Sequence, residues 1–129
     1  MEEDLAARLL ADPAVVEAVA GRVNWVERPQ GDSLPAIVLQ LISPARDYVL
    51  DGAQTLREDR VQVDCWGASY AAAKQAARAM IAAIEPPATF GATKFNAGFV
   101  QAERDGREDI GTMVVFRTSV DVTIWHRPA

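Results

Sequence analysis

The most constraining feature of the sequence is a long segment near its end, residues 112–125, in which apolar and polar side chains alternate. One face is expected to hold Val114, Phe116, Thr118, Val120, Val122 and Ile124. The other face is expected to hold Arg117, Ser119, Asp121, Thr123 and Trp125. A period of two residues is typical of a β-strand that covers a core on one side only. The chain is therefore expected to build a sheet with one buried face and one polar face.

Four other segments carry strand signals: residues 22–26, 36–42, 60–66 and 95–103. The segment at 36–42 is apolar except for Gln40, which favours a central strand buried on both faces. The segment at 60–66 alternates as the last strand does. The segment at 95–103 is expected to form a hairpin with the last strand, through a turn at Asp105-Gly106.

Three segments show the apolar spacing of helices. Residues 2–11 predict a first helix, and Asp12 and Pro13 then have the residue types of an N-cap and first position of a short second helix. The longest helix is expected at residues 69–85, between a serine N-cap and a pair of prolines. The side chains expected to face the core are Leu5, Leu9, Leu10, Val15, Val16, Val19, Ala73, Ala77, Met80, Ile81 and Ile84.

The order of these elements, α-α-β-β-β-α-β-β, defines the expected fold class. It predicts an α+β fold with a mixed or antiparallel β-sheet, one long helix packed on one face, and a short N-terminal helical pair. A chain of 129 residues is long enough for one core and too short for two independent ones. We therefore expect residues 1–129 to form a single domain.

The charge balance argues against several classes of function. With 13 basic and 18 acidic residues the net charge is −5, which is the wrong sign for gripping DNA through its phosphates. Few basic residues lie on the second helix, which disfavours a helix-turn-helix motif.

No apolar run approaches the ~20 residues of a membrane span. The acidic N-terminus does not resemble a signal peptide, so the sequence is expected to be that of an intracellular product.

Candidate catalytic residues are few. His126 is the only histidine and, lying three residues from the end, is expected at the surface; Cys65, the only cysteine, is expected to be a buried and inert thiol. Asp64 and Asp121 are expected on the polar sheet face, where they could approach each other as acid–base chemistry requires. No third partner or phosphate-binding loop accompanies them. We therefore predict no enzyme activity, no cofactor and no metal site.

Two segments are candidates for interaction with other proteins. Residues 44–59 form a hairpin or a loop that carries Tyr48, Val49, Leu50 and Leu56 between charged ends, which is apolar for a free loop, so it is expected to be an assembly element. Residues 103–109 alternate in charge at the expected hairpin tip. They are either a solvated turn or a contact in which Arg104 and Arg107 pair with a neighbouring subunit.

Several strings, in this order, resemble one known family. They are Gly21-Arg22-Val23, Leu34-Pro35-Ala36-Ile37-Val38, Leu50-Asp51-Gly52, Arg60-Val61-Gln62-Val63-Asp64-Cys65-Trp66, Ser69-Tyr70 and Ser119-Val120-Asp121-Val122-Thr123-Ile124-Trp125. In this succession the chain resembles the small tail-completion proteins of long-tailed bacteriophages, prophages and gene transfer agents. These proteins are also called tail terminators or head-tail joining proteins. The resemblance covers nearly the whole chain.

The resemblance implies a structural virion protein that is made in the bacterial host cytoplasm and has no catalytic residues. Such proteins form a ring, usually hexameric, that caps the head-proximal end of the tail tube. The implied partners are other copies of the chain, the tail tube protein and the head-tail connector or stopper. DNA would pass through the lumen without specific binding. The alternatives are a neck stopper or adaptor of the head-tail connector, and a small α+β ligand-binding domain or enzyme that uses Asp64 and Asp121.

Overall fold

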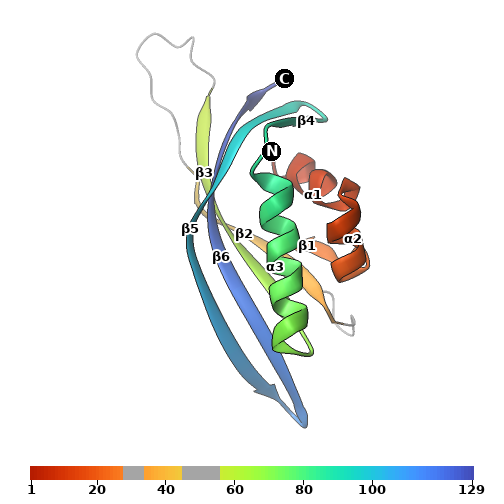
Figure 1. Ribbon diagram of the computed structural model, residues 1–129. Helices are drawn as coiled ribbons and strands as arrows, with labels where there is room; N and C mark the ends of the chain where they lie inside the picture. The colour runs from red at the N-terminus through yellow and green to blue at the C-terminus, as the bar shows by residue number, and fades with distance from the viewer. Residues whose placement is uncertain (28–33, 45–55) are drawn as a thin grey trace.

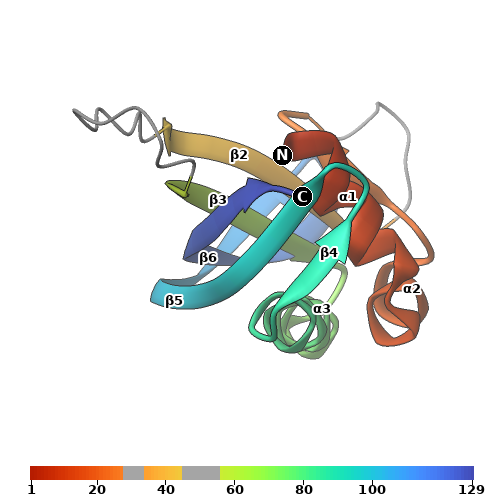
Figure 2. The same cartoon turned by 90° about the horizontal axis from the view of Figure 1, so that it is seen from above.

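The computed structural model describes residues 1–27, 34–44 and 56–129. In this part of the chain six strands form one mixed sheet, in the order β1-β2-β3-β6-β5-β4, that curls around three helices (Figures 1 and 2). The elements are α1 (Glu2–Ala11), α2 (Pro13–Val19), β1 (Val23–Trp25), β2 (Ala36–Pro44), β3 (Arg57–Gly67), α3 (Tyr70–Ile84), β4 (Ala88–Phe90), β5 (Thr93–Ile110) and β6 (Met113–Pro128). The predicted α+β class, with a helical pair followed later by one long helix, is confirmed.

Strand β6 lies between β3 and β5 and pairs antiparallel with both. Its predicted alternation is confirmed in the middle of the strand, where Val120, Val122 and Ile124 are buried on the side of the helices. Val114 is instead exposed, in the part of the β5–β6 hairpin that extends past the first turn of α3 (Figure 1). One strand, β1, is parallel to its neighbour β2.

The hairpin turn is not where the sequence placed it. Asp105 and Gly106 lie inside β5, paired with Thr118 and Arg117, and the expected turn at these residues is wrong. The chain reverses only after Ile110, at Gly111, whose φ of +61° suits a residue without a side chain. Residues 103–109 therefore lie within strand β5 and do not form the tip of the hairpin.

Three strand predictions need smaller corrections. Strand β3 begins at Arg57, so residues 57–59, which were expected in a hairpin or a loop, belong to the sheet. Strand β2 is buried on both faces only over residues 36–39, since Gln40 and Ile42 are exposed beyond the end of short β1. Strand β4, which pairs with the start of β5, was not predicted.

The helix caps act as the sequence predicts. The Asp12 side chain accepts hydrogen bonds from the backbone N–H groups of Ala14 and Val15, and the Ser69 hydroxyl accepts one from Ala72. Two expected core residues are instead exposed: Leu10 at 42% and Val16 at 39%. The predicted core positions Leu5, Leu9, Val15 and Val19 are buried, and Arg8 is an additional buried position on α1.

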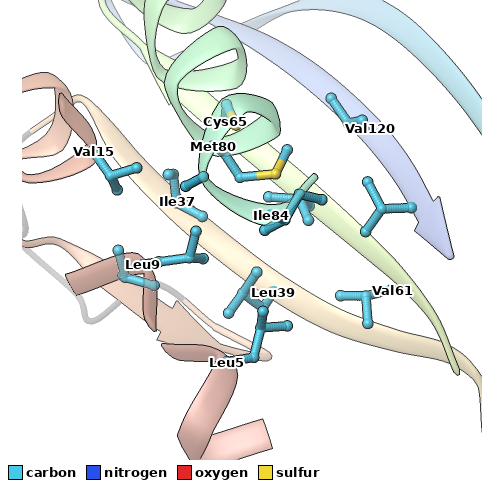
Figure 3. Close-up of a cluster of buried hydrophobic side chains, with 14 of the residues drawn as sticks. Leu5, Leu9, Val15, Ile37, Leu39, Val61, Cys65, Met80, Ile84 and Val120 are labelled. Carbon is cyan, nitrogen blue, oxygen red and sulfur yellow. The ribbon is translucent and has the colours of Figure 1, made fainter. Parts of the chain in front are cut away.

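The core lies between the helices and the side of the sheet that faces them (Figure 3). Leu5, Leu9 and Val15 come from α1 and α2, and Met80 and Ile84 from α3. They pack against sheet residues that include Ile37, Leu39, Val61, Cys65 and Val120. Full burial of such a side chain contributes about 1.5–3 kcal/mol. This packing orients the sheet so that its other face is free of helices.

Candidate assembly surface

The face of the sheet that points away from the helices carries three of the residues singled out in the sequence, Asp64, Asp121 and Arg104. We call it the outer sheet face. It includes Gln62, Asp64 and Trp66 of β3, Arg117, Ser119 and Asp121 of β6, and Phe99, Ala102, Arg104 and Glu108 of β5. These residues alternate along each strand with residues of the helix side, and cross-strand register aligns them. The predicted polar face is thus present.

Asp64 and Asp121 both lie on the outer sheet face, on neighbouring strands, but each has its own donors. The Ser119 hydroxyl donates to the Asp64 carboxylate over 2.6 Å, and the Gln62 amide donates to it over 3.0 Å. The Arg104 guanidinium donates to Asp121 over 3.1 Å. The two carboxylates are thus held by separate donors, and the arrangement resembles a fixed polar surface more than an acid–base pair.

A second charged pair continues this surface along β5 and β6. The Arg117 guanidinium lies 5.3 Å from the centroid of the Trp66 ring and forms an ion pair of 3.2 Å with Glu108. The side chains of Arg104 and Glu108 nevertheless remain 51% and 43% exposed. Both charged groups are therefore accessible to a further partner.

On the helix side of the sheet, ion pairs connect β5 to α3. Lys74 forms ion pairs with Glu103 at 2.8 Å and Asp105 at 3.1 Å, and the Thr118 hydroxyl also donates to Asp105. The hydrogen bond to Glu103 raises the pKa of Lys74 above its usual value. Desolvation raises the pKa of the Asp105 carboxyl, but hydrogen bonds from Lys74 and Thr118 outweigh it, so this pKa lies below its usual value. We call this group the α3–β5 clamp.

Arg107, the second basic residue that the sequence offered as a possible subunit contact, is weakly constrained. Its side chain is 63% exposed and lies 3.8 Å from Asp109, which is a long ion pair between two exposed groups. Arg104 and Arg107 thus both lie within β5, on opposite faces of the sheet, and not in a turn.

Both ends of the sheet have open edges within the described residues. Strand β4 pairs only with the first three residues of β5, so from Ala97 to Ile110 that strand has β6 as its one strand neighbour. At the other end β1 stops opposite Leu39, and β2 continues to Pro44 with β3 as its one strand neighbour. Open edges present unpaired backbone donors and acceptors to another strand.

Exposed apolar side chains accompany these edges. Phe99 is 51% and Val100 37% exposed on the open part of β5, and Ile42 is 44% exposed on β2. Met113 is 57% exposed at the hairpin tip. Of the apolar residues predicted to mediate assembly, Leu56 is half-buried just before β3. The other three, Tyr48, Val49 and Leu50, lie outside the described residues.

His126 is not a surface residue, and that expectation is wrong. Its ring is buried, and Nε2 lies 2.6 Å from a carboxylate oxygen of Asp59. The reason is that β6 continues to Pro128 and pairs with both β3 and β5 at this level, so His126 lies opposite Arg57 and Phe95. The pair borders a cavity of about 540 Å³ at the N-terminus of α1.

Arg8 is a buried charge that the sequence reading missed. Its guanidinium donates to the carbonyl oxygen of Pro86 and lies 5.2 Å from the centroid of the Phe95 ring. Burial lowers its pKa, an effect that nearby Asp12 opposes. The position lies between Leu5 and Leu9 at helical spacing, which is the signal that places it on the core side of α1.

Cys65 is buried as predicted, and burial together with nearby Asp64 and Glu103 raises the pKa of its thiol. Within residues 1–27, 34–44 and 56–129 no group of three or more His, Cys, Asp and Glu side chains is arranged to hold a metal ion. In the same residues no helix has the length and hydropathy needed to cross a membrane.

Comparison with known proteins gives two similarities. The profile of the family described as Tail completion protein gp17 matches residues 3–127. Among solved structures, a chain from the virion of a native gene transfer agent particle superposes with a TM-score of 0.69. The two chains are 14% identical, and the match covers 98% of this chain and 94% of that one, which is a likeness of fold. No curated protein matches the chain in sequence.

Proposed function

The chain belongs to the family of the tail completion protein gp17, a family of structural virion proteins, and on this premise we propose that it acts as a ring at the head-proximal end of a tail tube. In this proposal the ring, a hexamer as in the family it resembles, ends polymerisation of the tube. It also presents a surface to the head connector. Its partners are other copies of the chain, the tube protein and a connector or stopper protein.

The observation that carries the ring is the pair of open edges at opposite ends of the sheet. A closed ring needs two different, complementary surfaces on each subunit, because every contact joins one side of a subunit to the other side of the next. The open edge of β5 and the open edge of β2 are two such surfaces, and each has an exposed apolar residue, Phe99 and Ile42. Backbone pairing between edges is a common form of strand addition.

The acidic net charge suits passage of DNA. A net charge of −5 on each subunit is multiplied around a ring, and a wall of this sign repels phosphate instead of retaining it. We therefore propose a lumen through which DNA passes without specific binding. We also propose that the protein catalyses no reaction, which is supported by the separate donors of Asp64 and Asp121.

The test uses purified protein, tail tubes and DNA-filled heads from the same particle. The proposal expects the protein to bind one end of the tubes and to block their further growth. Binding to filled heads with no effect on tubes would instead identify a neck stopper or adaptor.

A substitution on the open edge of β5 tests whether this edge takes part in capping. Phe99→Lys places a charge on the open edge, so it is expected to abolish capping while the monomer stays folded by circular dichroism. Leu10→Lys is the matched control, because Leu10 is exposed to a similar degree and belongs to helix α1 and not to an edge strand. Equal capping by both variants would contradict a role for this edge.

A further inference from the structure

The open part of β5 carries a charge pattern that is complementary to itself. Residues 103–109 read Glu-Arg-Asp-Gly-Arg-Glu-Asp, with Gly106 at the centre. If a second copy of this strand is laid alongside in the antiparallel direction with Gly106 opposite Gly106, Arg104 meets Glu108 and Asp105 meets Arg107. The two-fold symmetry repeats each contact, so four pairs of opposite charge form.

The faces of the strand agree with this register. Directly opposite residues of an antiparallel pair lie on the same face, with Cβ atoms about 4.5–5.5 Å apart. Arg104 and Glu108 both belong to the outer sheet face, while Asp105 and Arg107 both point to the helix side. These side chains are 40–63% exposed in the single chain, so all four are accessible to a second copy.

Contacts within each chain extend the pattern. Asp121 already binds Arg104, and Arg117 already binds Glu108. Pairing would thus create a row of alternating charge across both sheets, from Asp121 and Arg104 of one copy to Glu108 and Arg117 of the other. A network of this kind holds each side chain from two sides, which lowers the entropic cost of each added pair.

The unfavourable contact between Glu103 and Asp109, which the two-fold symmetry also repeats, is compensated within each chain. Glu103 would lie opposite Asp109, which brings two acidic groups together. Glu103 is already bound by Lys74 at 2.8 Å, and Asp109 has Arg107 beside it. The like-charge contact is therefore weakened by cations on both sides.

From these observations we infer that the free protein pairs with a second copy of itself along β5, antiparallel and centred on Gly106. This contact is isologous, unlike the contact of a ring, and it joins the two six-stranded sheets into one. A β5 edge occupied in this way is not available to any other strand. The dimer is thus a form that precedes assembly, and it does not depend on the proposed ring.

The test is sedimentation of the purified protein over a concentration series at low and high salt. The wild type is expected to dimerise at low salt and to dissociate as salt screens the charges. In the dimer, Arg104→Glu alone places a glutamate opposite Glu108, and Glu108→Arg alone places an arginine opposite Arg104. The dissociation constant of the dimer is therefore expected to rise about tenfold or more in each variant. An equal mixture of the two variants restores opposite charges at these positions and is expected to form the heterodimer.

Two controls complete the test. Arg107→Glu, which would place a glutamate opposite Asp105, is also expected to weaken the dimer. Arg78→Glu makes the same change of charge on the exposed side of α3 and is expected to have no effect. A wild type that stays monomeric at low salt would overturn the inference. So would dimers of unchanged strength in the two folded single variants, or a mixture that pairs no better than either variant alone.

Discussion

Gly98 lies where β5 passes closest to the end of α3. A Cβ atom added there would be 2.6 Å from the carbonyl oxygen of Ile84, which is backbone and cannot rotate away. The strand is held on its other side by pairing with Ile124. The close approach of helix and strand at this level therefore requires a residue without a side chain.

We expect Gly98→Ala to destabilise the fold by about 1–3 kcal/mol, because either the helix or the strand must shift. Gly106→Ala on the same strand is the control, since its Cβ would meet only the Arg117 side chain at an ordinary 3.5 Å. That variant is expected to be neutral or slightly stabilising. Thermal unfolding at high salt checks both, and a loss of equal size in the two variants would contradict the account.

The α3–β5 clamp acts between elements and should make stability depend on pH. The pKa of Asp105 is lowered in the folded protein, so its contribution is complete above the unfolded value of about 3.9 and is lost as the pH falls through the folded value. The pKa of Lys74 is raised, so its contribution is complete below the unfolded value of about 10.4 and is lost as the pH rises through the folded value.

Lys74→Met is accordingly expected to be less stable than the wild type at pH 7, and the difference is expected to be smaller at pH 3, because the pH has then fallen below the unfolded value of Asp105. Urea unfolding at the two pH values measures it. Lys94→Met, which leaves the clamp intact, is the control and should change stability little at either pH. A deficit of Lys74→Met that persists undiminished at pH 3 would show that the lysine acts through packing and not through charge.

The segment that precedes β3 keeps its predicted role in assembly as a proposal. Replacing Tyr48, Val49 and Leu50 by serine removes its apolar side chains without touching β3, which begins at Arg57. We expect the melting temperature to be unchanged and capping of tail tubes to be lost. Capping at the wild-type level by the triple variant would remove this segment from the assembly surface.

Elements with strong local signals could be predicted from the sequence. The Asp12 and Ser69 caps and the alternation around Val122 depend on neighbouring residues alone, and all three are confirmed. The turn at Asp105-Gly106 failed because pairing with β6 and the Lys74 contacts, which involve residues distant in sequence, outweigh a local turn preference.

The predicted site shows the same division between local and distant contacts. The placement of Asp64 and Asp121 on one face followed from period-two alternation. The burial of His126 depends on Asp59, which is 67 residues away and was assigned to a loop. No local pattern marks such a pair.

For the whole molecule, the helices and the sheet share one continuous core, and we propose that residues 1–129 form a single domain. The sheet, supported by helices on one face, has a polar outer face and, within the described residues, two open edges. We propose that these surfaces meet its neighbours in a particle when the subunit completes a tail.

The most direct measurement is the distribution of tail lengths, by electron microscopy, in particles made without this protein. The account predicts tubes of irregular, excessive length that are not joined to heads, and a return to uniform joined tails when the wild-type protein is supplied. Uniform tails that are joined to filled heads in its absence would contradict the account.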